Sequence, residues 1–544
     1  MEQRKLRKRG MLMFDRTAGS HVVELLKQWN VDHIYGMPGD SINELMEELR
    51  KVDIRFIQIR HEETGALAAS AYSKLTGHIG VCLSIAGPGA IHLQNGLYDA
   101  KKDKTPVLAI VGQVTSTSVG TDVFQELKLE SMFEDVSVYN RRVQTAEQLP
   151  DMLNQAIRAA YAEKGPAVLI VSDDLFSMKI KREKMLTSPE YTEPNIRAAE
   201  EDLMAALKLL ETAKKPVILA GKGAQGATED VLAFSEKLKA PIIASLPAKG
   251  MIPDTHPYNL GQLGQLGTEP AEQAMKQADL IILAGTAYPY REYLPDKAQA
   301  IQIDIDPRTI GKYYPATVGI VGDLGPALVW LSERLSEKDA GFLEEYRDKR
   351  TDWHQQLQED INKQTEMLQP QQVIAEIQKI MQQDAVVSLD VGSITIWTAK
   401  YLQLTGQKLV LSSWLGTMGC GLPGAIAAKL AYPEKQAIAI VGDGGFSMGM
   451  QDFVTAVKYE LPMIIVIFNN QKLQLIEDEQ KKAGNKPTNV DLANIDYAAF
   501  AIACGGQGYT VKSRVELQDA LSTAKAGKQP VVIDAYVEDI SAIL

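Results

Sequence analysis

Cysteine is scarce in this sequence, which has only Cys82, Cys420 and Cys504 among its 544 residues. Their number is odd, they lie far apart, and no two of them form a CxxC pair. This pattern supports neither a disulfide framework nor a zinc site built on cysteine. A reducing compartment fits it best, so we expect a cytoplasmic protein.

Long apolar runs are also missing. The longest, residues 461–468, has eight residues, whereas a membrane-spanning helix needs about 20. We therefore expect no transmembrane helix and no stable membrane anchor. The basic start, MEQRKLRKRG, is followed by only four apolar-type residues before Asp15, too few for the core of a signal peptide. We interpret residues 1–13 as a disordered leader, with a basic arm for anionic surfaces as the alternative.

Positive charge is not in excess either. The chain has 57 Lys and Arg against 69 Asp and Glu, a net charge of −12, so nucleic acid is a poor partner. Apolar residues make up 45% and charged residues 23%, which is typical of globular proteins. The length corresponds to about three or four ordinary domains, so we expect several hydrophobic cores.

Helical and strand-like stretches alternate along the chain, which predicts an α/β fold with parallel sheets. We expect three doubly wound domains, with related first and third sheets. The predicted boundaries are a first domain at 14–180, a charged, proline-bearing linker at 181–200, a central domain at 201–335, a polar linker at 336–372 and a third domain at 373–544.

The third domain has the strongest motif. Its strand AIAIV enters the segment 442–445, GDGG, and its next strand ends in Asn469 and Asn470, 27 residues after Asp443. If the two strands are parallel neighbours, Asp443 and Asn470 lie side by side as oxygen ligands suited to Mg²⁺ or Ca²⁺ with a diphosphate. The glycines Gly442, Gly444 and Gly445 would let backbone N–H groups approach phosphate oxygens. Two ordinary turns are the alternative.

The same segment contains GxSxG, the pattern of a hydrolase nucleophile, centred on Ser447. In that fold the catalytic histidine follows the serine in the chain. The last of the seven histidines is His354, which precedes Ser447. We therefore reject a serine hydrolase.

In the first domain, the strand RFIQI ends at Arg60-His61-Glu62-Glu63, before a helix of small residues. This is not the zinc protease motif HExxH, because residue 65 is Gly. Glu62 could handle a proton in an apolar cleft. An acidic residue that merely favours the helix N-terminus is the alternative.

The central domain contains Gly221, Gly223 and Gly226 in the spacing GxGxxG between a strand and a helix. No acidic residue ends a second strand about 20 residues later, as a dinucleotide site requires, and Asp304 and Asp306 lie too far along the chain. A nucleotide site and a purely structural loop both remain open.

Together these motifs resemble the thiamine diphosphate enzymes with three α/β domains, and within them the pyruvate oxidases and pyruvate:quinone oxidoreductases. The resemblance covers nearly the whole chain. It rests on the segments GMPGDS, RHEE, AGPGAIHLQNGLYDA, PVLAIVGQ, FQE, YPYREY, IDIDP, TMGCGLPGAIAAKL, GDGGFSMGMQDF and NNQKLQLIEDEQ.

The resemblance implies a role for each matching residue. Glu62 would bond N1′ of the aminopyrimidine of thiamine diphosphate. Asp443, Asn470 and the backbone carbonyl of Lys472 would bind Mg²⁺, and Met418 would hold the cofactor in a bent conformation.

The resemblance also implies a substrate pocket for pyruvate or another small 2-oxo acid, lined by Phe124, Gln125 and Glu479, with His92 in the segment that faces the thiazolium. The central domain would bind FAD. The matching FAD-contacting residues are Gly221, Gly223, Tyr288, Arg291, Asp304 and Asp306. Sites in this family lie between two subunits, which implies a homodimer at least and commonly a homotetramer.

The expected activity is oxidative decarboxylation of pyruvate with phosphate and O₂, giving acetyl phosphate, CO₂ and H₂O₂. Gln474 and Leu475 replace a Gly and an aromatic residue usual in the oxidases, which favours the alternative of an acetolactate synthase-type carboligase. The chain also stops at Leu544, without the C-terminal extension of quinone-linked relatives, so a quinone-linked pyruvate dehydrogenase is expected less. A non-catalytic paralogue that binds the cofactor is a further alternative.

Overall fold

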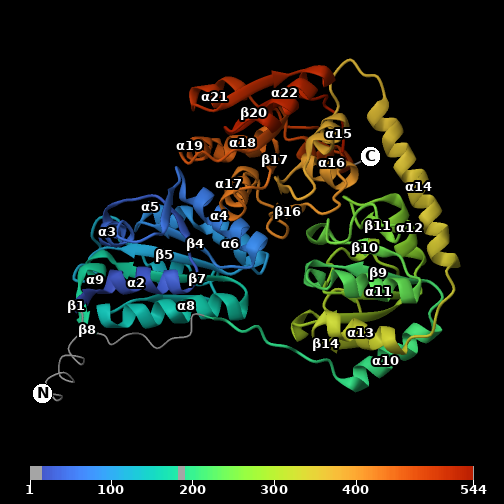
Figure 1. Cartoon of the computed structure of the whole chain (residues 1–544), viewed down its shortest axis with the longest axis horizontal. Coiled ribbons are helices and arrows are strands. Elements are labelled where there is room, and N and C mark those ends of the chain that lie inside the picture. The colour runs from blue at the N-terminus through green and yellow to red at the C-terminus, as the bar shows by residue number, and fades with distance from the viewer. Residues whose placement is uncertain (1–14, 182–189, 543–544) are drawn as a thin grey trace, which may run out of the picture.

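The computed structural model describes residues 15–181 and 190–542. Three α/β domains follow one another along the chain, and each is built on a six-stranded parallel sheet covered by helices (Figure 1). This confirms the predicted fold class. The predicted leader at 1–13 lies outside the described residues.

The first domain has its sheet in the order β3-β2-β4-β5-β7-β6. A short antiparallel ribbon, β1 with β8, joins the two ends of this domain. The strands are β1 Asp15–Thr17, β2 His33–Gly36, β3 Arg55–Gln58, β4 Gly80–Ser84, β5 Val107–Gln113, β6 Tyr139–Arg142, β7 Pro166–Ser172 and β8 Lys179–Lys181. The helices are α2 Ala18–Gln28, α3 Asn43–Leu49, α4 Glu62–Thr76, α5 Pro88–His92, α6 Gln94–Lys102, α7 Leu129–Met132, α8 Leu149–Glu163 and α9 Asp173–Ser177.

The third domain has the order β16-β15-β17-β18-β20-β19, so its strands follow the same topology as those of the first domain. The predicted relation between these two sheets is therefore supported by their strand order. The strands are β15 Val386–Leu389, β16 Lys408–Leu411, β17 Ala437–Gly442, β18 Ile464–Asn469, β19 Gln507–Val511 and β20 Val531–Tyr536. The helices are α15 Pro370–Ile380, α16 Ser393–Tyr401, α17 Gly421–Ala431, α18 Asp443–Gly449, α19 Phe453–Lys458, α20 Gln474–Lys482, α21 Tyr497–Ala503 and α22 Arg514–Ala526.

The central domain has a different order, β11-β10-β9-β12-β13-β14. Here the chain starts in the middle of the sheet and the strand order reverses between β9 and β12, as in dinucleotide-binding folds. The strands are β9 Pro216–Ala220, β10 Ile242–Ala244, β11 Asn259–Gln262, β12 Leu280–Ala284, β13 Gln299–Asp304 and β14 Val318–Val321. The helices are α10 Glu200–Thr212, α11 Thr228–Leu238, α12 Glu269–Gln277 and α13 Leu324–Arg334.

The predicted linker at 336–372 is not a plain connection. It contains the 22-residue helix α14, Gly341–Asn362, which lies along the outside of the central domain and leads to the third domain (Figure 1). The first two turns of α14 pack against the protein through three buried side chains, Phe342, Leu343 and Tyr346. The third domain then begins with α15 at Pro370. In the predicted linker at 181–200, the described residues 190–199 form no helix or strand.

A single hydrophobic cluster joins the first and third domains. Helix α4 consists largely of small residues, with Ala66, Ala68 and Ala69 fully buried, so helix α17 of the third domain packs closely against it. Leu422 and Ile426 of α17 belong to the same cluster. Within the described ranges, no helix is long and apolar enough to cross a membrane.

Candidate active site

The third sheet brings the two predicted metal ligands together. Strands β17 and β18 are parallel neighbours in which Gly442 pairs with Phe468, so Asp443 and the segment after Asn469 leave the sheet at the same edge. Asp443 is also the first residue of α18. The backbone N–H of Gln471 donates to Asp443 Oδ2 at 2.8 Å.

Asp443 is 4% exposed, and its burial raises the pKa of the carboxyl to about 6 although the N–H groups of Gly444 and Gln471 oppose this. A cation would offset the cost of burying this charge. Asn470 presents its Oδ1 atom, which accepts from the N–H of Lys472 at 3.2 Å. A carboxylate, an amide oxygen and, by the predicted set, the backbone carbonyl of Lys472 would make an all-oxygen donor set of the kind that suits Mg²⁺.

The described residues contain no cluster of three or more His, Cys, Asp or Glu side chains that could hold a metal. The set proposed here has only one carboxylate, that of Asp443, and its other donors are an amide oxygen and a backbone carbonyl. Mg²⁺ often keeps water and substrate phosphate as its other ligands, so such a set is sufficient when a diphosphate is present.

The glycines beside Asp443 differ in what surrounds them. A Cβ atom at Gly442 would meet nothing within 4 Å, whereas one at Gly444 would lie 3.3 Å from Met418 Cε and one at Gly445 would lie 3.0 Å from the carboxyl carbon of Asp390. The loop is therefore open at Gly442 and packed at Gly444, where Met418 is one of the neighbours. An open glycine loop at a helix start fits a diphosphate.

Asp390 was not singled out from the sequence. It follows β15, and its carboxylate accepts from the N–H groups of Val391, Gly419 and Gly421 at 2.7, 2.9 and 3.2 Å. Burial raises its pKa to about 6. These bonds fix the loop that carries Met418, and the only sequence signal was an acidic residue at a strand end.

Glu62 begins α4 and is 6% exposed. Its Oε2 atom lies 2.9 Å from His92 Nδ1, and Oε1 lies 2.9 Å from the position that a Cβ atom at Gly89 would take. The ring of His61, the residue that caps α4, stacks on the ring of His92 at 4.4 Å between centroids. The predicted proton-handling carboxylate is therefore enclosed, and His92 lies against it.

The third domain holds the turn that carries Glu62. The carboxylate of Asp452 accepts from the N–H of Arg60 at 2.7 Å, and the hydroxyl of Tyr459 accepts from the N–H of Gln58 at 2.8 Å. Asp452 is completely buried, and this burial raises its pKa. Sequence reasoning missed Asp452, because its partner is a backbone group 392 residues away.

The predicted substrate-pocket residues differ in their surroundings. Phe124 is 85% exposed, and Gln125 has a φ of 66° and packs against Gly87. Glu479 is exposed on α20. No hydrogen bond or ion pair joins these residues to Glu62 in the described ranges.

In the central domain, Gly221 and Gly223 lie where the strand order reverses. Their N–H groups donate to the carbonyls of Ala284 and Gly285 at 2.9 and 3.0 Å, and a Cβ atom at either glycine would collide with the loop after β12. These glycines are thus explained by close packing of two strand-end loops. The reversal of strand order is itself the place where such sheets bind dinucleotides.

The other predicted FAD contacts lie around this edge. Tyr288 is 5% exposed and its hydroxyl has no partner in the described part of the chain. Arg291 donates to the carbonyls of Leu294 and Pro295. Asp304 accepts from the N–H of Asp306 at 2.9 Å.

Asp306 itself forms ion pairs with Arg308 and with Lys104 of the first domain. A buried, unpartnered hydroxyl such as that of Tyr288 and the reversed strand order fit a bound dinucleotide.

The GxSxG segment is not a nucleophile elbow. Ser447 lies within α18, and its hydroxyl donates to the carbonyl of Gly444 at 2.8 Å. The described residues give it no histidine partner, which agrees with the order of residues in the chain.

Family models of all three domains match this chain. They are described as the thiamine pyrophosphate enzyme N-terminal TPP binding domain, central domain and C-terminal TPP binding domain, over residues 16–132, 203–331 and 390–535. The chain belongs to the thiamine pyrophosphate enzymes, and it is a thiamine diphosphate-dependent enzyme of the acetolactate synthase-like superfamily.

Particular relatives cover nearly the full length. The chain is 55% identical to the "Putative thiamine pyrophosphate-containing protein YdaP" of Bacillus subtilis, over 96% of this chain and 92% of that one. It is 39% identical to the pyruvate oxidase of Lactiplantibacillus plantarum, over 96% and 88%. It is 30% identical to the "Probable acetolactate synthase large subunit" of Methanococcus aeolicus, over 96% and 92%.

Proposed function

We propose that this protein is a pyruvate oxidase, which converts pyruvate, phosphate and O₂ to acetyl phosphate, CO₂ and H₂O₂ with thiamine diphosphate, Mg²⁺ and FAD. The observation that carries the proposal is the enclosed Glu62 carboxylate at the start of α4, with His92 against it. The relative named as a pyruvate oxidase is more similar to this chain than the acetolactate synthases are.

The bound thiamine diphosphate would supply a thiazolium that accepts the electron pair left when a 2-oxo acid loses CO₂. Asp443, Asn470 and the Lys472 carbonyl would hold Mg²⁺ with the diphosphate. Met418 would contact the cofactor and hold it in a bent conformation.

Glu62 would hold and exchange a proton at its carboxylate, next to the pyrimidine. Its burial excludes water from that proton. His92, Phe124, Gln125 and Glu479 would surround the substrate.

FAD would accept the electrons in the central domain, at the edge where β9 and β12 end. The FAD-contacting residues that we propose are Gly221, Gly223, Tyr288, Arg291, Asp304 and Asp306. Phe124 is 85% exposed and Ile91, beside His92, is 50% exposed, so we propose that a second copy covers this side of the site in a homodimer or homotetramer. The three cysteines are free thiols, which supports a cytoplasmic location.

A second candidate is an acetolactate synthase-type carboligase. Leu475 stands where the oxidases have an aromatic residue, and it packs against the core of the third sheet. In that case a second 2-oxo acid would capture the two-carbon unit, and FAD would not be reduced. The acetolactate synthase relatives support this candidate.

The deciding experiment is an anaerobic absorption spectrum between about 300 and 550 nm, recorded before and after adding pyruvate to protein with thiamine diphosphate and Mg²⁺. We expect a flavin spectrum that bleaches on addition of pyruvate, because the electrons pass to the flavin. The matched control is Glu62→Gln, which keeps the shape of the side chain but removes its ability to exchange a proton. It should bind the same flavin and bleach at least about 100-fold more slowly.

A flavin spectrum that persists, together with acetolactate among the products, would contradict the oxidase and support the carboligase. Equal bleaching by Glu62→Gln would show that Glu62 has no role in proton exchange. A wild-type protein without any turnover of 2-oxo acids would favour a non-catalytic role.

A further inference from the structure

Helix α6 presents a stripe of polar side chains to the third domain. Asn95, Asp99 and Asp103 are spaced four residues apart, so they lie along one face of the helix and its C-cap. The stripe is about 12 Å long, at 1.5 Å per residue. We call these three residues the α6 stripe. In the third domain, the α6 stripe contacts the segment 411–417, which is followed directly by Met418.

Asn95 joins the two elements that carry predicted cofactor contacts. Its Nδ2 atom donates to Glu63 Oε1 at 2.6 Å and to Thr417 Oγ1 at 2.8 Å. Glu63 neighbours Glu62 in the first turn of α4, and Thr417 neighbours Met418. An ionised carboxylate can only accept hydrogen bonds. The Glu63 carboxylate therefore requires Asn95 to present its amide nitrogen, not its amide oxygen, toward Glu63.

Asp103 holds the other end of the same segment. Its carboxylate accepts from the N–H of Ser413 at 3.1 Å, from the N–H of Trp414 at 3.0 Å and from the hydroxyl of Ser413. Burial opposes ionisation of Asp103, but Lys74 and Ser413 hold its pKa below the ordinary value. A charged carboxylate therefore anchors residues 413 and 414 from the first domain.

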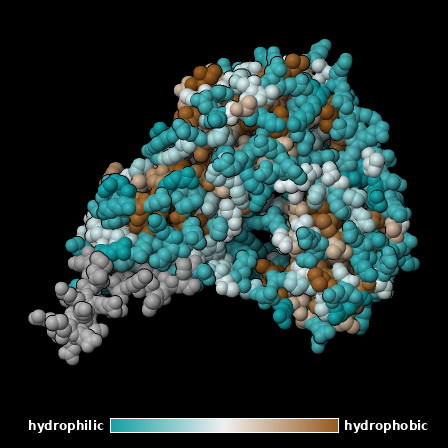
Figure 2. Space-filling model, in the orientation of Figure 1, coloured by the Kyte–Doolittle hydropathy of each residue, from teal (hydrophilic) through white to brown (hydrophobic). Residues whose placement is uncertain are grey.

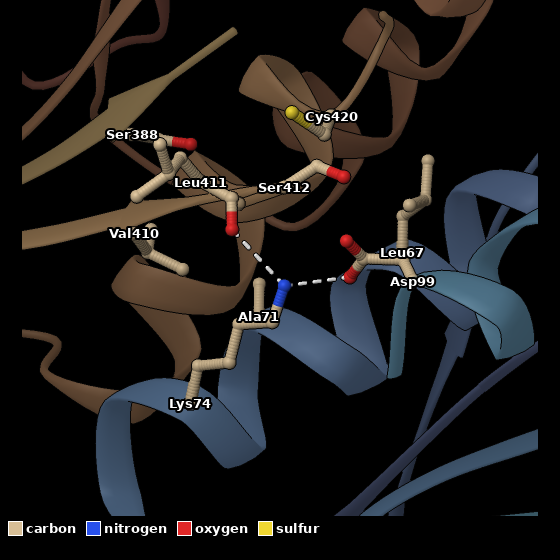
Figure 3. A pocket seen from close by; sticks show the side chains of 10 residues that line it. Leu67, Ala71, Lys74, Asp99, Ser388, Val410, Leu411, Ser412 and Cys420 are labelled. Carbon is tan, nitrogen blue, oxygen red and sulfur yellow. Dashed lines mark hydrogen bonds and ion pairs between the residues drawn. The ribbon is translucent and has the colours of Figure 1, made fainter. Parts of the chain in front are cut away.

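Asp99 acts through Lys74, a buried residue near the end of α4 (Figure 3). Lys74 Nζ donates to Asp99 Oδ2 at 2.7 Å and to the carbonyl of Leu411 at 3.0 Å. Figure 3 shows this lysine between the first domain and the strand end at Leu411 and Ser412. The α6 stripe thus binds the segment 411–417 at its start, middle and end.

Hydrogen bonds within the segment 411–417 stabilise it, and the segment continues into residues 418–420, which we call the Met418 loop. The hydroxyl of Ser412 accepts from the N–H of Thr417 at 3.1 Å, and Thr417 Oγ1 donates to the carbonyl of Met418 at 3.1 Å. Asp390 fixes the loop from the other side through Gly419 and Gly421. Asn95 is therefore the first-domain contact closest to Met418 along this segment.

We propose that the α6 stripe, through Asn95, is a positioning element that sets the affinity for thiamine diphosphate by holding the Met418 loop in place against the first domain. This inference rests on the proposed function, in which Met418 supports the bound cofactor. Without the Asn95 bond, the Met418 loop must be ordered when the cofactor binds, and that ordering reduces affinity.

The test is isothermal titration of the cofactor-free full-length protein with thiamine diphosphate at saturating Mg²⁺. Thr417→Val removes the hydroxyl that Asn95 binds and keeps the shape of the side chain, whereas Thr417→Ser keeps the hydroxyl. We expect the dissociation constant to rise about 5- to 10-fold in Thr417→Val and in Asn95→Ala, and to stay within about twofold of wild type in Thr417→Ser.

The double variant Asn95→Ala/Thr417→Val distinguishes loss of the hydrogen bond between these two residues from two independent effects on the structure. If the two residues act through one bond, the double variant should bind no more weakly than the weaker single variant. Lys102→Ala, an exposed position on the same helix, is the control and should bind like wild type. Thermal unfolding of the cofactor-free variants should remain cooperative, with only a small fall in the midpoint, because a lost part-buried hydrogen bond costs about 1 kcal/mol.

Two results would overturn the proposal. Unchanged affinity in both Thr417→Val and Asn95→Ala would show that the stripe does not act on the cofactor. Equal losses in Thr417→Val and Thr417→Ser would show that the hydroxyl is irrelevant. Wild-type protein that does not bind thiamine diphosphate would instead contradict the proposed function, so the two failures are distinct.

Discussion

At the scale of single residues, the third domain contains a carboxylate that is buried without a cation beside it in the part of the chain that the structure describes. Asp534 on β20 has no exposed surface, and one of its oxygens, Oδ1, accepts from Asn469 Nδ2 at 2.9 Å. The other oxygen has no partner in the described residues. Burial raises the pKa of Asp534 to about 6. This charge therefore costs stability at neutral pH.

The prediction concerns Asp534→Asn. Because the folded pKa is above the unfolded value of about 3.8, the folded state binds more protons between about pH 4 and 6, and the free energy of unfolding falls as pH rises through that window. Above pH 6 the full cost is present. We expect the variant to be more stable than wild type by about 1 to 2 kcal/mol at pH 8, after allowing for its unpaired amide.

Thermal unfolding of the two proteins without added Mg²⁺, at pH 8 and near pH 4, measures this effect. Near pH 4 the wild-type carboxyl is largely protonated while the unpaired amide of the variant still costs stability, so the gain should be lost and the variant should be no more stable than wild type. Asp519→Asn, at an exposed position, is the control and should change neither midpoint. A stability gain of the same size at both pH values would show that the buried charge is not its cause.

At the residue scale, sequence reasoning could predict proximity where it is local to strand ends. Asp443 and Asn470 were selected because two neighbouring strands end in oxygen-bearing residues, and the structure brings these strand ends together, whereas their role as metal ligands stays a prediction. Asp390, Asp452 and Asn95 were missed. Their partners are backbone groups or side chains about 30 to more than 300 residues away, and no local pattern encodes such contacts.

At the scale of helices and strands, close approach is made possible by glycine. A Cβ atom at Gly96 of α6 would lie 2.5 Å from Ala66 Cβ and 2.6 Å from the backbone nitrogen of Leu67 in α4. Replacing an ordinary helical glycine with alanine stabilises a helix by about 1 kcal/mol. At Gly96 the new Cβ atom would collide with a backbone atom, so we expect the substitution to lower the free energy of unfolding and not to raise it.

We therefore predict that Gly96→Ala destabilises the protein by about 1 to 3 kcal/mol, because α6 must move away from α4. The measurement is the thermal unfolding midpoint. Gly325→Ala is the control, since its new Cβ atom would meet only the mobile end of the Asp230 side chain, at 2.6 Å. The control should be neutral or slightly stabilising, and a similar loss in both variants would contradict the packing argument.

Element-scale predictions succeeded for apolar strands and failed for a polar helix. The runs VLAIVG and AIAIV form buried central strands, because continuous aliphatic residues suit a sheet covered on both faces. Helix α14 was expected only as a linker. It has few apolar positions, and ion pairs such as Lys349 with Glu345, at 2.8 Å, support its exposed face instead.

At the scale of the whole molecule, length and alternation predicted three domains but not their strand orders. The order in each sheet depends on contacts between distant strands, which the sequence pattern does not show. Figure 2 shows a largely hydrophilic face that is hollowed between the first and central domains. Large apolar side chains nevertheless remain exposed near both parts of the candidate site.

These exposed side chains predict a second copy. Ile91 is 50% exposed beside His92, Phe124 is 85% exposed, and Trp414 and Met448 are 50% and 60% exposed near the Met418 loop. Scattered apolar residues are normal on a surface, but several around one site indicate an interface. If a second copy covers them, Ile91→Asp should raise the dimer dissociation constant at least about tenfold, because it would bury an unpaired charge.

Sedimentation velocity over a dilution series measures this change. Wild-type protein should sediment as a dimer or larger assembly at micromolar concentration, and Ile91→Asp should shift toward the monomer with an unchanged circular dichroism spectrum. Val515→Asp, at a 66% exposed apolar position on α22, is the control and should keep the wild-type assembly. A monomeric wild type would contradict the proposal that a second copy covers these exposed side chains.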